Sequence, residues 1–260
     1  MRIVLGIEYD GRAFCGWQAQ PSRLSVQDAL EAAIAKMAGH PVRLHAAGRT
    51  DAGVHACQQV AHFDTEVNRS LTAWVRGVNS FLPAGLAVLW SRQLGDEFHA
   101  RFSAVQRHYR YVLLNHPVRP ALLAGRVGWH HAPLSLEAMQ LAAQRLVGEH
   151  DFSSFRSSEC QAKSPVKHLT RFAIRREGDL LLCDVSAGGF LHHMVRNLMG
   201  AMVHIGRGAA EPEWMSDLLA ARDRTIAPAT FMPDGLYFAG VSYPEQFGIA
   251  SDPSFRHHLV

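Results

Sequence analysis

The stretch SVQDALEAAIAKMAGHPVRLHAAGRTDAGVH, residues 25–55, holds a helix, a strand and a glycine-flanked turn in close succession. Ser25 is a typical N-cap residue, and a carboxylate stands three residues later in the capping-box position. Apolar residues recur at helical spacing from Val26 onward, and Gly39 is typical of a helix end. The pattern therefore predicts a helix from Val26 up to Gly39, followed by a strand over Val42–Ala47.

The sequence on either side of this stretch continues the same alternation of elements. Apolar, β-branched runs predict strands at Ile3–Tyr9, Gln59–Asp64 and Ala87–Leu94, and helical spacing predicts a helix at Leu71–Phe81. The resulting order is β-α-β-β-α-β. This order is typical of a split βαβ, ferredoxin-like sheet with its helices on one face.

The second half of the chain repeats this organisation more loosely. It contains strand patterns, helix patterns and one hairpin turn at residues 177–179. The expected elements are strands at Tyr109–Leu114, Phe172–Arg175, Leu180–Val185 and Leu236–Val241, and helices at Leu136–Val147, at Leu191–Ile205 and from Pro212. We therefore expect two related α+β halves, residues 1–104 and 105–260, with no low-complexity linker between them.

Composition narrows the class of protein. The 260 residues are 48% hydrophobic and 19% charged, which is ordinary for a folded domain and too apolar for a disordered chain. No apolar run approaches the roughly 20 residues that span a bilayer. Four scattered cysteines form no CxxC pair, so a reducing compartment is expected. These features predict a cytoplasmic protein without a membrane segment.

Positive charge is concentrated in two stretches, although the net charge is only +3. Neither residues 99–136 nor residues 161–176 contain Asp or Glu, and both are rich in Arg or Lys. Aromatic residues are interleaved with the first set of cations, which includes Arg107 and Arg110. Cations neutralise phosphates and aromatic rings stack on exposed bases, so the pattern favours RNA binding. The alternative is a solvated face of a domain whose acids lie elsewhere.

The turn between the strands around residues 47 and 59 carries the first candidate for chemistry. Here Gly48 and Gly53 flank Asp51, and Arg49 lies two positions before the carboxylate. Glycines permit sharp turns or close approach to a ligand, and loops on a rigid scaffold often present reactive groups. The alternative is an Asx-turn, in which the Asp51 side chain bonds its own backbone. Both interpretations stay open on the residues alone.

A second unusual position is Arg196, the only formal charge between Asp184 and Arg207. A helix this apolar is expected to be largely buried, and a buried cation normally needs a partner. A carboxylate is the natural partner for the planar guanidinium. Alternatively, the side chain could extend to solvent along a partly covered helix.

Cofactor signatures are missing from the sequence. No two of the 16 histidines are separated by three or four residues, so no helical HxxH or HxxxH pair exists. Neither a GxGxxG following a strand nor a P-loop lysine signature occurs. We therefore expect no metal and no nucleotide cofactor.

Several distinctive stretches occur together and in a fixed order. They are LGIEYDG (5–11), GWQ (16–18), AGRTDAGVH (47–55), FHARFS (98–103), YRY (109–111), GEHDF (148–152) and FLHHMVRN (190–197). This set resembles the motifs of the tRNA pseudouridine synthase A family. The resemblance covers residues 3–243 without departure at a motif position, and the tail after Tyr243 matches none of these motifs.

The resemblance implies a fold, a reaction and roles for residues. It implies two related ferredoxin/RRM-like halves with mixed antiparallel sheets and an active-site cleft between them. It also implies a homodimer that needs no metal or cofactor and isomerises uridine to pseudouridine at positions 38, 39 and 40 in the anticodon stem-loop of tRNA. By the same resemblance Asp51 is the catalytic aspartate, Tyr109 is the active-site tyrosine, and Arg196 pairs with the aspartate. We further expect Arg49 to clamp phosphate or fill the gap left by the extruded base, and Leu236 to form an apolar wall for the uracil.

Three routes for the carboxylate stay open: attack at C1′, attack at C6, or removal of the C2′ proton to give a glycal. Two rival functions are also open. One is a non-catalytic RNA-binding protein of RRM-like fold. The other is a glycoside hydrolase or nucleosidase that pairs Asp51 with Asp10 or Asp64, which would need carboxyl groups about 5–9 Å apart.

Overall fold

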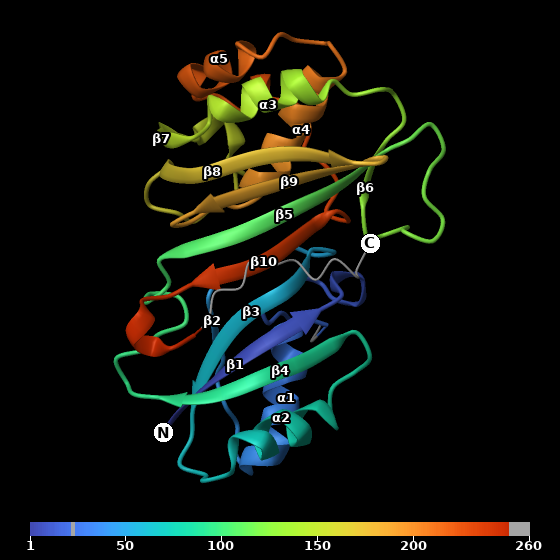
Figure 1. Ribbon diagram of the computed structural model, residues 1–260. Coiled ribbons are helices and arrows are strands. Elements are labelled where there is room, and N and C mark those ends of the chain that lie inside the picture. Colours follow the sequence, from blue (N-terminus) through green and yellow to red (C-terminus); the bar gives the residue numbers. More distant parts are fainter. Residues whose placement is uncertain (22–23, 250–260) are drawn as a thin grey trace. The chain divides into compact units, whose positions relative to one another are not determined.

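The computed structural model describes residues 1–21 and 24–249, which form two compact units (Figure 1). The first unit contains Met1–Arg107 together with the described chain from Tyr237 on, and the second contains His108–Leu236. Each unit combines helices with a largely antiparallel sheet, so the predicted α+β class is confirmed. Residues 250–260, most of the tail that matched no motif, lie outside the described residues.

In the first unit, strand β1 (Arg2–Tyr9) lies between β3 (His55–Asp64) and β4 (Leu86–Leu94) and is antiparallel to both. Two further strands share the outer side of β3. The short β2 (His45–Ala46) is antiparallel to its far end, and β10 (Leu236–Ser242) is parallel to its first residues. The β1-β2-β3-β4 arrangement agrees with the predicted split βαβ sheet.

Helices α1 (Val26–Ala38) and α2 (Leu71–Asn79) both lie on one face of this sheet (Figure 1). The side chain of Ser25 accepts a hydrogen bond from the third helical N–H, and Gly39 ends α1 with a left-handed φ of 74°. The predicted start and end of this helix are therefore confirmed. Trp74 of α2 is fully buried and meets Phe63 of β3 edge-on at 5.3 Å, which joins helix to sheet.

The sheet of the second unit has the order β5-β9-β8-β7, and β6 is parallel to β5. These strands and the three helices of the unit are β5 (Gln106–Asn115), β6 (Gly128–His130), β7 (Gly148–Asp151), β8 (Val166–Glu177), β9 (Leu180–Ala187), α3 (Leu136–Gln144), α4 (Met194–Gly206) and α5 (Trp214–Ala221). The predicted hairpin at residues 177–179 joins β8 to β9. Helix α3 packs on both β8 and α4.

The division of the chain differs from the expected one in the position of β10. The sequence pattern places everything after residue 105 in a second domain, whereas the structure groups residues 237–249 with the first unit. The physical reason is the parallel pairing of Tyr237 with His55 and of Phe238 with Ala56. The boundary between the units also falls slightly later, after Arg107.

Several elements are shorter than the hydrophobic pattern predicts: α2 ends at Asn79 rather than at residue 81, and α3 ends at Gln144 rather than at residue 147. Strand β2 covers only His45–Ala46 because the main chain of Leu44 bonds to α1 instead of to β3: its N–H donates to Glu31 and its carbonyl accepts from Gln27. Helix α4 begins at Met194 rather than at residue 191 because the preceding residue is left-handed, with a φ of 62°.

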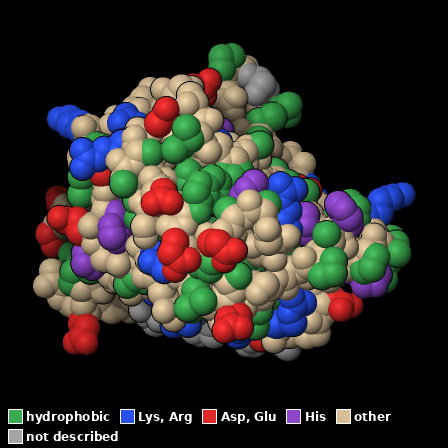
Figure 2. All heavy atoms as spheres, turned by 90° about the horizontal axis from the view of Figure 1, so that it is seen from above, with side chains coloured by type: hydrophobic (Ala, Val, Ile, Leu, Met, Phe, Trp, Pro, Cys, Tyr) green, Lys and Arg blue, Asp and Glu red, His purple; other side chains and the backbone are tan. Residues whose placement is uncertain are grey.

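Among the described helices, none has the length and apolar character needed to cross a membrane. Figure 2 looks onto the side of the molecule that carries α3 and α5, where acidic, basic and hydrophobic side chains are interspersed. This face therefore shows no continuous positive field of the kind that a phosphate backbone favours.

Candidate active site

The turn that presents Asp51 is closed by main-chain atoms. The N–H of Val54 donates to the carbonyl of Asp51 at 3.2 Å, and Gly53 takes the third position with a φ of 79°. A positive φ at this position is characteristic of a type II turn and favours glycine. This main-chain hydrogen bond closes the turn. The shape of the turn therefore does not depend on the Asp51 carboxylate, whereas the shape of an Asx-turn would. The Asp51 side chain is half-buried.

Two buried polar side chains support the turn from the sheet. The hydroxyl of Tyr9 in β1 lies 2.8 Å from Oγ1 of Thr50, and the amide of Gln59 in β3 donates to the carbonyl of Gly48 at 2.8 Å. Burial raises the pKa of Tyr9 to about 12, so the phenol stays neutral at physiological pH. Gln59 stood at the start of the expected strand, so the sequence pattern did not indicate this support; the observed β3 begins four residues earlier.

Two glycines allow the main chain at residues 11–17 to contact the turn directly. The N–H of Trp17 donates to the carbonyl of Thr50 at 3.0 Å, and a Cβ at Gly16 would lie only 2.8 Å from that oxygen. A Cβ at Gly11 would lie 2.2 Å from the carbonyl oxygen of Val54. No side chain fits at either position without moving the turn. This explains why glycine ends the LGIEYDG stretch and begins the GWQ stretch.

The end of the turn is anchored by His55, which is buried. Its Nδ1 accepts the N–H of Gly11 at 3.1 Å, and its ring stacks on Tyr237 of β10 with 4.6 Å between ring centroids. The same nitrogen lies 3.3 Å from a carboxylate oxygen of Asp10. Strand β10 therefore contributes directly to the scaffold beneath the turn.

The structure weakens the rival carboxylate-pair hydrolase. Asp64 lies at the opposite end of β3 from His55, about 30 Å away at 3.3 Å per residue, and Arg2 holds it bidentately at 2.8 and 2.9 Å. Asp10 lies near the turn, but its hydrogen bonds with Arg12 lower its pKa, so it stays ionised. A general acid needs a raised pKa instead.

Arg49 and Arg107, two predicted RNA contacts, have different surroundings. Arg49 is exposed and belongs to the turn itself. Arg107 is half-buried, and its guanidinium donates hydrogen bonds to backbone carbonyls, including that of Ala47 immediately before the turn.

In the second unit, Tyr109 and Arg196 are both half-buried. The ring of Tyr109 on β5 meets Phe190 edge-on, with 4.9 Å between centroids and an interplanar angle of 80°. Arg196 lies in the first turn of α4, where its Nε donates to the carbonyl of Phe231 at 2.9 Å. The N–H of Phe231 donates back to the carbonyl of Arg196 at 3.2 Å. The pairing of Arg196 with Asp51 stays a prediction.

Asn197, the last residue of the FLHHMVRN stretch, and two residues outside the motifs form a network that holds Arg196 in place. Neighbouring Asn197 is buried; its amide donates to the carbonyl of Phe155 at 2.8 Å, and its oxygen accepts from Thr230 at 2.6 Å. Arg224 donates to the same oxygen at 3.2 Å. This network fixes the segment that contains Phe231, and so indirectly the plane of the Arg196 guanidinium.

Arg110 is the predicted RNA contact that the structure corrects. Its side chain is almost fully buried and forms a bidentate ion pair with Asp184 of β9, with distances of 2.5 and 3.0 Å. Arg175 of β8 donates to the same carboxylate at 2.8 Å. A buried guanidinium that already faces a carboxylate has a structural role, so we assign Arg110 to the core of the second unit and not to phosphate binding.

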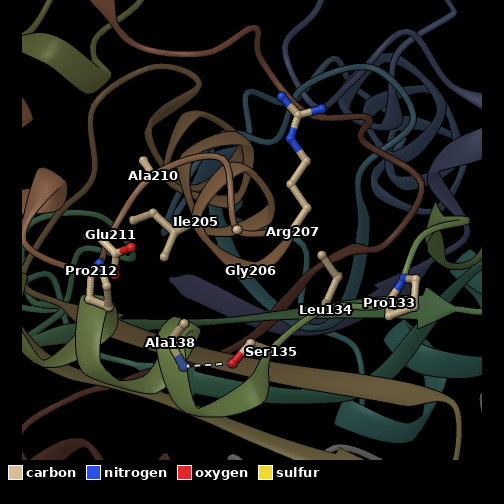
Figure 3. A pocket seen from close by; sticks show the side chains of 11 residues that line it. Pro133, Leu134, Ser135, Ala138, Ile205, Gly206, Arg207, Ala210, Glu211 and Pro212 are labelled. Carbon is tan, nitrogen blue, oxygen red and sulfur yellow. Dashed lines mark hydrogen bonds between the residues drawn. The ribbon is translucent and has the colours of Figure 1, made fainter.

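Leu236 is also buried, at the start of β10. None of the predicted site residues lines the hollow of about 460 Å³ between the start of α3 and the end of α4. Figure 3 shows that the hydroxyl of Ser135 is used there to cap α3 through Ala138, and that the Arg207 side chain points away from it. This hollow is therefore not the candidate active site.

A family match agrees with these features. The sequence profile described as "tRNA pseudouridine synthase" matches residues 6–103 and 142–244, which together make up most of the chain. The chain belongs to the tRNA pseudouridine synthase family. The matched segments include Asp51 and Arg196, whereas Arg107, Tyr109 and Arg110 fall between them.

Relatives within this family are similar over nearly their whole length. A protein of Thiobacillus denitrificans is 61% identical over 249 residues, which cover 96% of each chain. One of Chromobacterium violaceum is 62% identical over 252 residues, also 96% of each chain. One of Dechloromonas aromatica is 59% identical over 254 residues, 98% of this chain and 97% of the relative. All three are named tRNA pseudouridine synthase A.

The contact at Gly16 generates a first prediction. Replacing Gly16 by Ala should displace the turn and lower catalytic turnover on the order of 10–100-fold, because small misplacements of reacting groups are costly. Gly39→Ala is the matched control: its φ is also positive, at 74°, but nothing lies within 4 Å of the added Cβ. We expect Gly39→Ala to lose about 1 kcal/mol of stability and no turnover. Equal turnover in the two variants would contradict this account.

The buried ion pair of Arg110 generates a second prediction. Arg110→Gln should lower the free energy of unfolding by about 3 kcal/mol, because Asp184 stays behind in a poorly solvated site. The more exposed Arg175 offers the control, and Arg175→Gln should cost about 1 kcal/mol or less. Urea unfolding measures both losses. If Arg110→Gln instead keeps its stability and its tRNA binding depends less on salt, the result contradicts this account and shows that Arg110 contacts phosphate.

Proposed function

We propose that the protein isomerises uridine to pseudouridine at positions 38, 39 and 40 in the anticodon stem-loop of tRNA, with Asp51 as the catalytic group. The observation that carries the proposal is a half-buried carboxylate on a turn that is held by side chains of β1 and β3 and by the main chain of residues 11–17. Membership of the tRNA pseudouridine synthase family supports the reaction type, and the names of the relatives support tRNA as the substrate.

The reaction needs few groups because it only rearranges atoms. The N1–C1′ glycosidic bond breaks, the uracil turns while it stays bound, and a C5–C1′ bond forms. C5 loses its proton to solvent and N1 gains one, so the product has the same mass as the substrate. Neither electrons nor a phosphoryl group are transferred, so the chemistry itself requires no cofactor.

In this proposal each site residue has one task. The carboxylate of Asp51 acts as nucleophile or base, and the guanidinium of Arg196 is its charged partner. Tyr109 stacks on the extruded uracil, and its edge-on contact with Phe190 holds the ring at a defined angle. Exposed Arg49 contacts phosphate or fills the gap left by the base. Leu236 provides apolar surface for the uracil.

The partners follow from the same family resemblance. We propose tRNA as the macromolecular substrate, with the anticodon stem-loop as the part that is recognised. We also propose that the protein works as a homodimer in the cytoplasm, where tRNA is modified. A non-catalytic RNA-binding protein is the second candidate, and it differs from the first in having no need for Asp51.

The decisive experiment uses an unmodified tRNA transcript labelled with tritium at C5 of uridine. Wild-type protein should release tritium to water and leave pseudouridine at positions 38–40, read by mapping at nucleotide resolution. Asp51→Asn keeps the size and polarity of the side chain, and it should abolish release while tRNA affinity stays within severalfold. The matched control is Asp64→Asn, which changes a carboxylate at the opposite end of β3 and should retain turnover.

The outcomes separate the candidates. Tritium release by Asp51→Asn at the wild-type rate would refute the assignment of Asp51. Binding of tRNA by the wild type without release would favour a pure RNA-binding protein. Free uracil as the product would indicate hydrolysis.

Arg196 generates a separate prediction. Arg196→Lys should reduce single-turnover rate at least tenfold, because an ammonium cannot donate to the carbonyl of Phe231 and present a planar fork at the same time. Arg207→Lys, at the exposed end of the same helix, should leave the rate unchanged. Wild-type rates in Arg196→Lys would show that the guanidinium is not needed.

A further inference from the structure

Arg107 forms an unusually complete set of hydrogen bonds to backbone carbonyls within the first unit. Its Nε and one terminal nitrogen both donate to the carbonyl of Ala47, at 3.2 and 3.1 Å. The other terminal nitrogen donates to the carbonyl of Ala104 at 3.2 Å, and a further bond reaches the carbonyl of Arg101 at 2.5 Å. All three guanidinium nitrogens therefore contact main chain.

The carbonyl of Ala47 lies at the entrance to the turn that carries Asp51. The N–H of the same residue donates to the carbonyl of Val60 in β3 at 2.8 Å, and Gln59 holds the next carbonyl, that of Gly48. Strand β3 thus fixes the entrance to the turn. Arg107 holds the same entrance through two charge-assisted hydrogen bonds to the carbonyl of Ala47.

The other anchors of Arg107 are themselves immobilised. The N–H of Ala100 donates to Nδ1 of buried His62 in β3 at 3.2 Å, and the carbonyl of Ala100 accepts from the hydroxyl of Tyr243 at 2.6 Å. The N–H of Val105 donates to the carbonyl of Ser242 in β10 at 2.8 Å. The segment at residues 100–105 is thereby tied to both strands, so Arg107 connects the turn to fixed points.

A contact with tRNA phosphate would require Arg107 to give up bonds that this arrangement already provides. Exchanging several carbonyl bonds for one phosphate contact brings little net gain, because each abandoned carbonyl must find a new donor. We propose that Arg107 is a positioning residue: it holds the entrance of the Asp51 turn through the carbonyl of Ala47 and does not read the tRNA backbone. The inference rests on the proposed function only for its kinetic test.

The kinetic test compares Arg107→Gln, Arg107→Lys and Arg49→Gln in single-turnover tritium release and in tRNA binding over a range of salt concentrations. A loosened turn should lower the rate at saturating enzyme on the order of 10–100-fold in both Arg107 variants, with Kd within about twofold and an unchanged salt slope. Lysine keeps the charge but not the planar fork, so it should not restore the rate. Arg49→Gln should show the opposite signature: weaker binding and a salt slope reduced by about one.

A second measurement needs no tRNA and no activity. Hydrogen exchange should become faster at the amides of Trp17 and Val54, whose acceptors are the carbonyls of Thr50 and Asp51, in both Arg107 variants. Strands β1 and β4 are the internal reference, because a general loss of stability would accelerate exchange there as well. Acceleration confined to the turn supports the proposal, and equal acceleration in all parts of the first unit overturns it.

The outcomes distinguish this inference from the proposed function. Weaker, less salt-dependent binding with an unchanged saturated rate in Arg107→Gln, or full recovery in Arg107→Lys, would make Arg107 a phosphate contact and overturn the inference. An inactive wild type would refute the function instead, and hydrogen exchange would still decide whether Arg107 restrains the turn.

Discussion

Main-chain contact between residues 11–17 and the turn at residues 50–54 is the constraint on which the proposed active site depends. Surface loops are usually more mobile than the elements that they connect. Here the loop peptides bond directly to other peptides, and glycines at positions 11 and 16 bring the two segments within touching distance. A nucleophile must stay within about half an ångström of its working position, and peptide-to-peptide packing provides that order before substrate arrives.

The supports around the turn are polar but do not compete with Asp51 for protons. The phenol of Tyr9, with a pKa of about 12, and the amide of Gln59 stay neutral at physiological pH, so their hydrogen bonds do not weaken as pH changes. Arg107 adds permanent positive charge next to the turn without a titratable proton near neutrality. The contacts of Tyr9 and Gln59 can therefore hold the same geometry over the range of pH in which a catalytic carboxylate is ionised.

Local patterns predicted the elements of the first unit well because their signals lie within a few residues. The N-cap at Ser25 and the left-handed end at Gly39 bound α1 as expected. Interactions between distant residues were not visible. The partner of Arg110 lies 74 residues away, so a cation expected at an RNA surface was in fact half of a buried ion pair. The motif assigned Asp51, but no periodicity indicated which side chains support its turn.

The return of β10 to the first unit has a consequence for how the protein is made. Residues 108–236 are an insertion within the first unit, whose sheet includes a strand near the end of the chain. During synthesis on the ribosome, the sheet of the first unit lacks β10 beside β3 until the intervening residues have been translated. The second unit, contiguous in sequence, can fold before the first is finished, which reverses the usual N-to-C order of domain folding during synthesis.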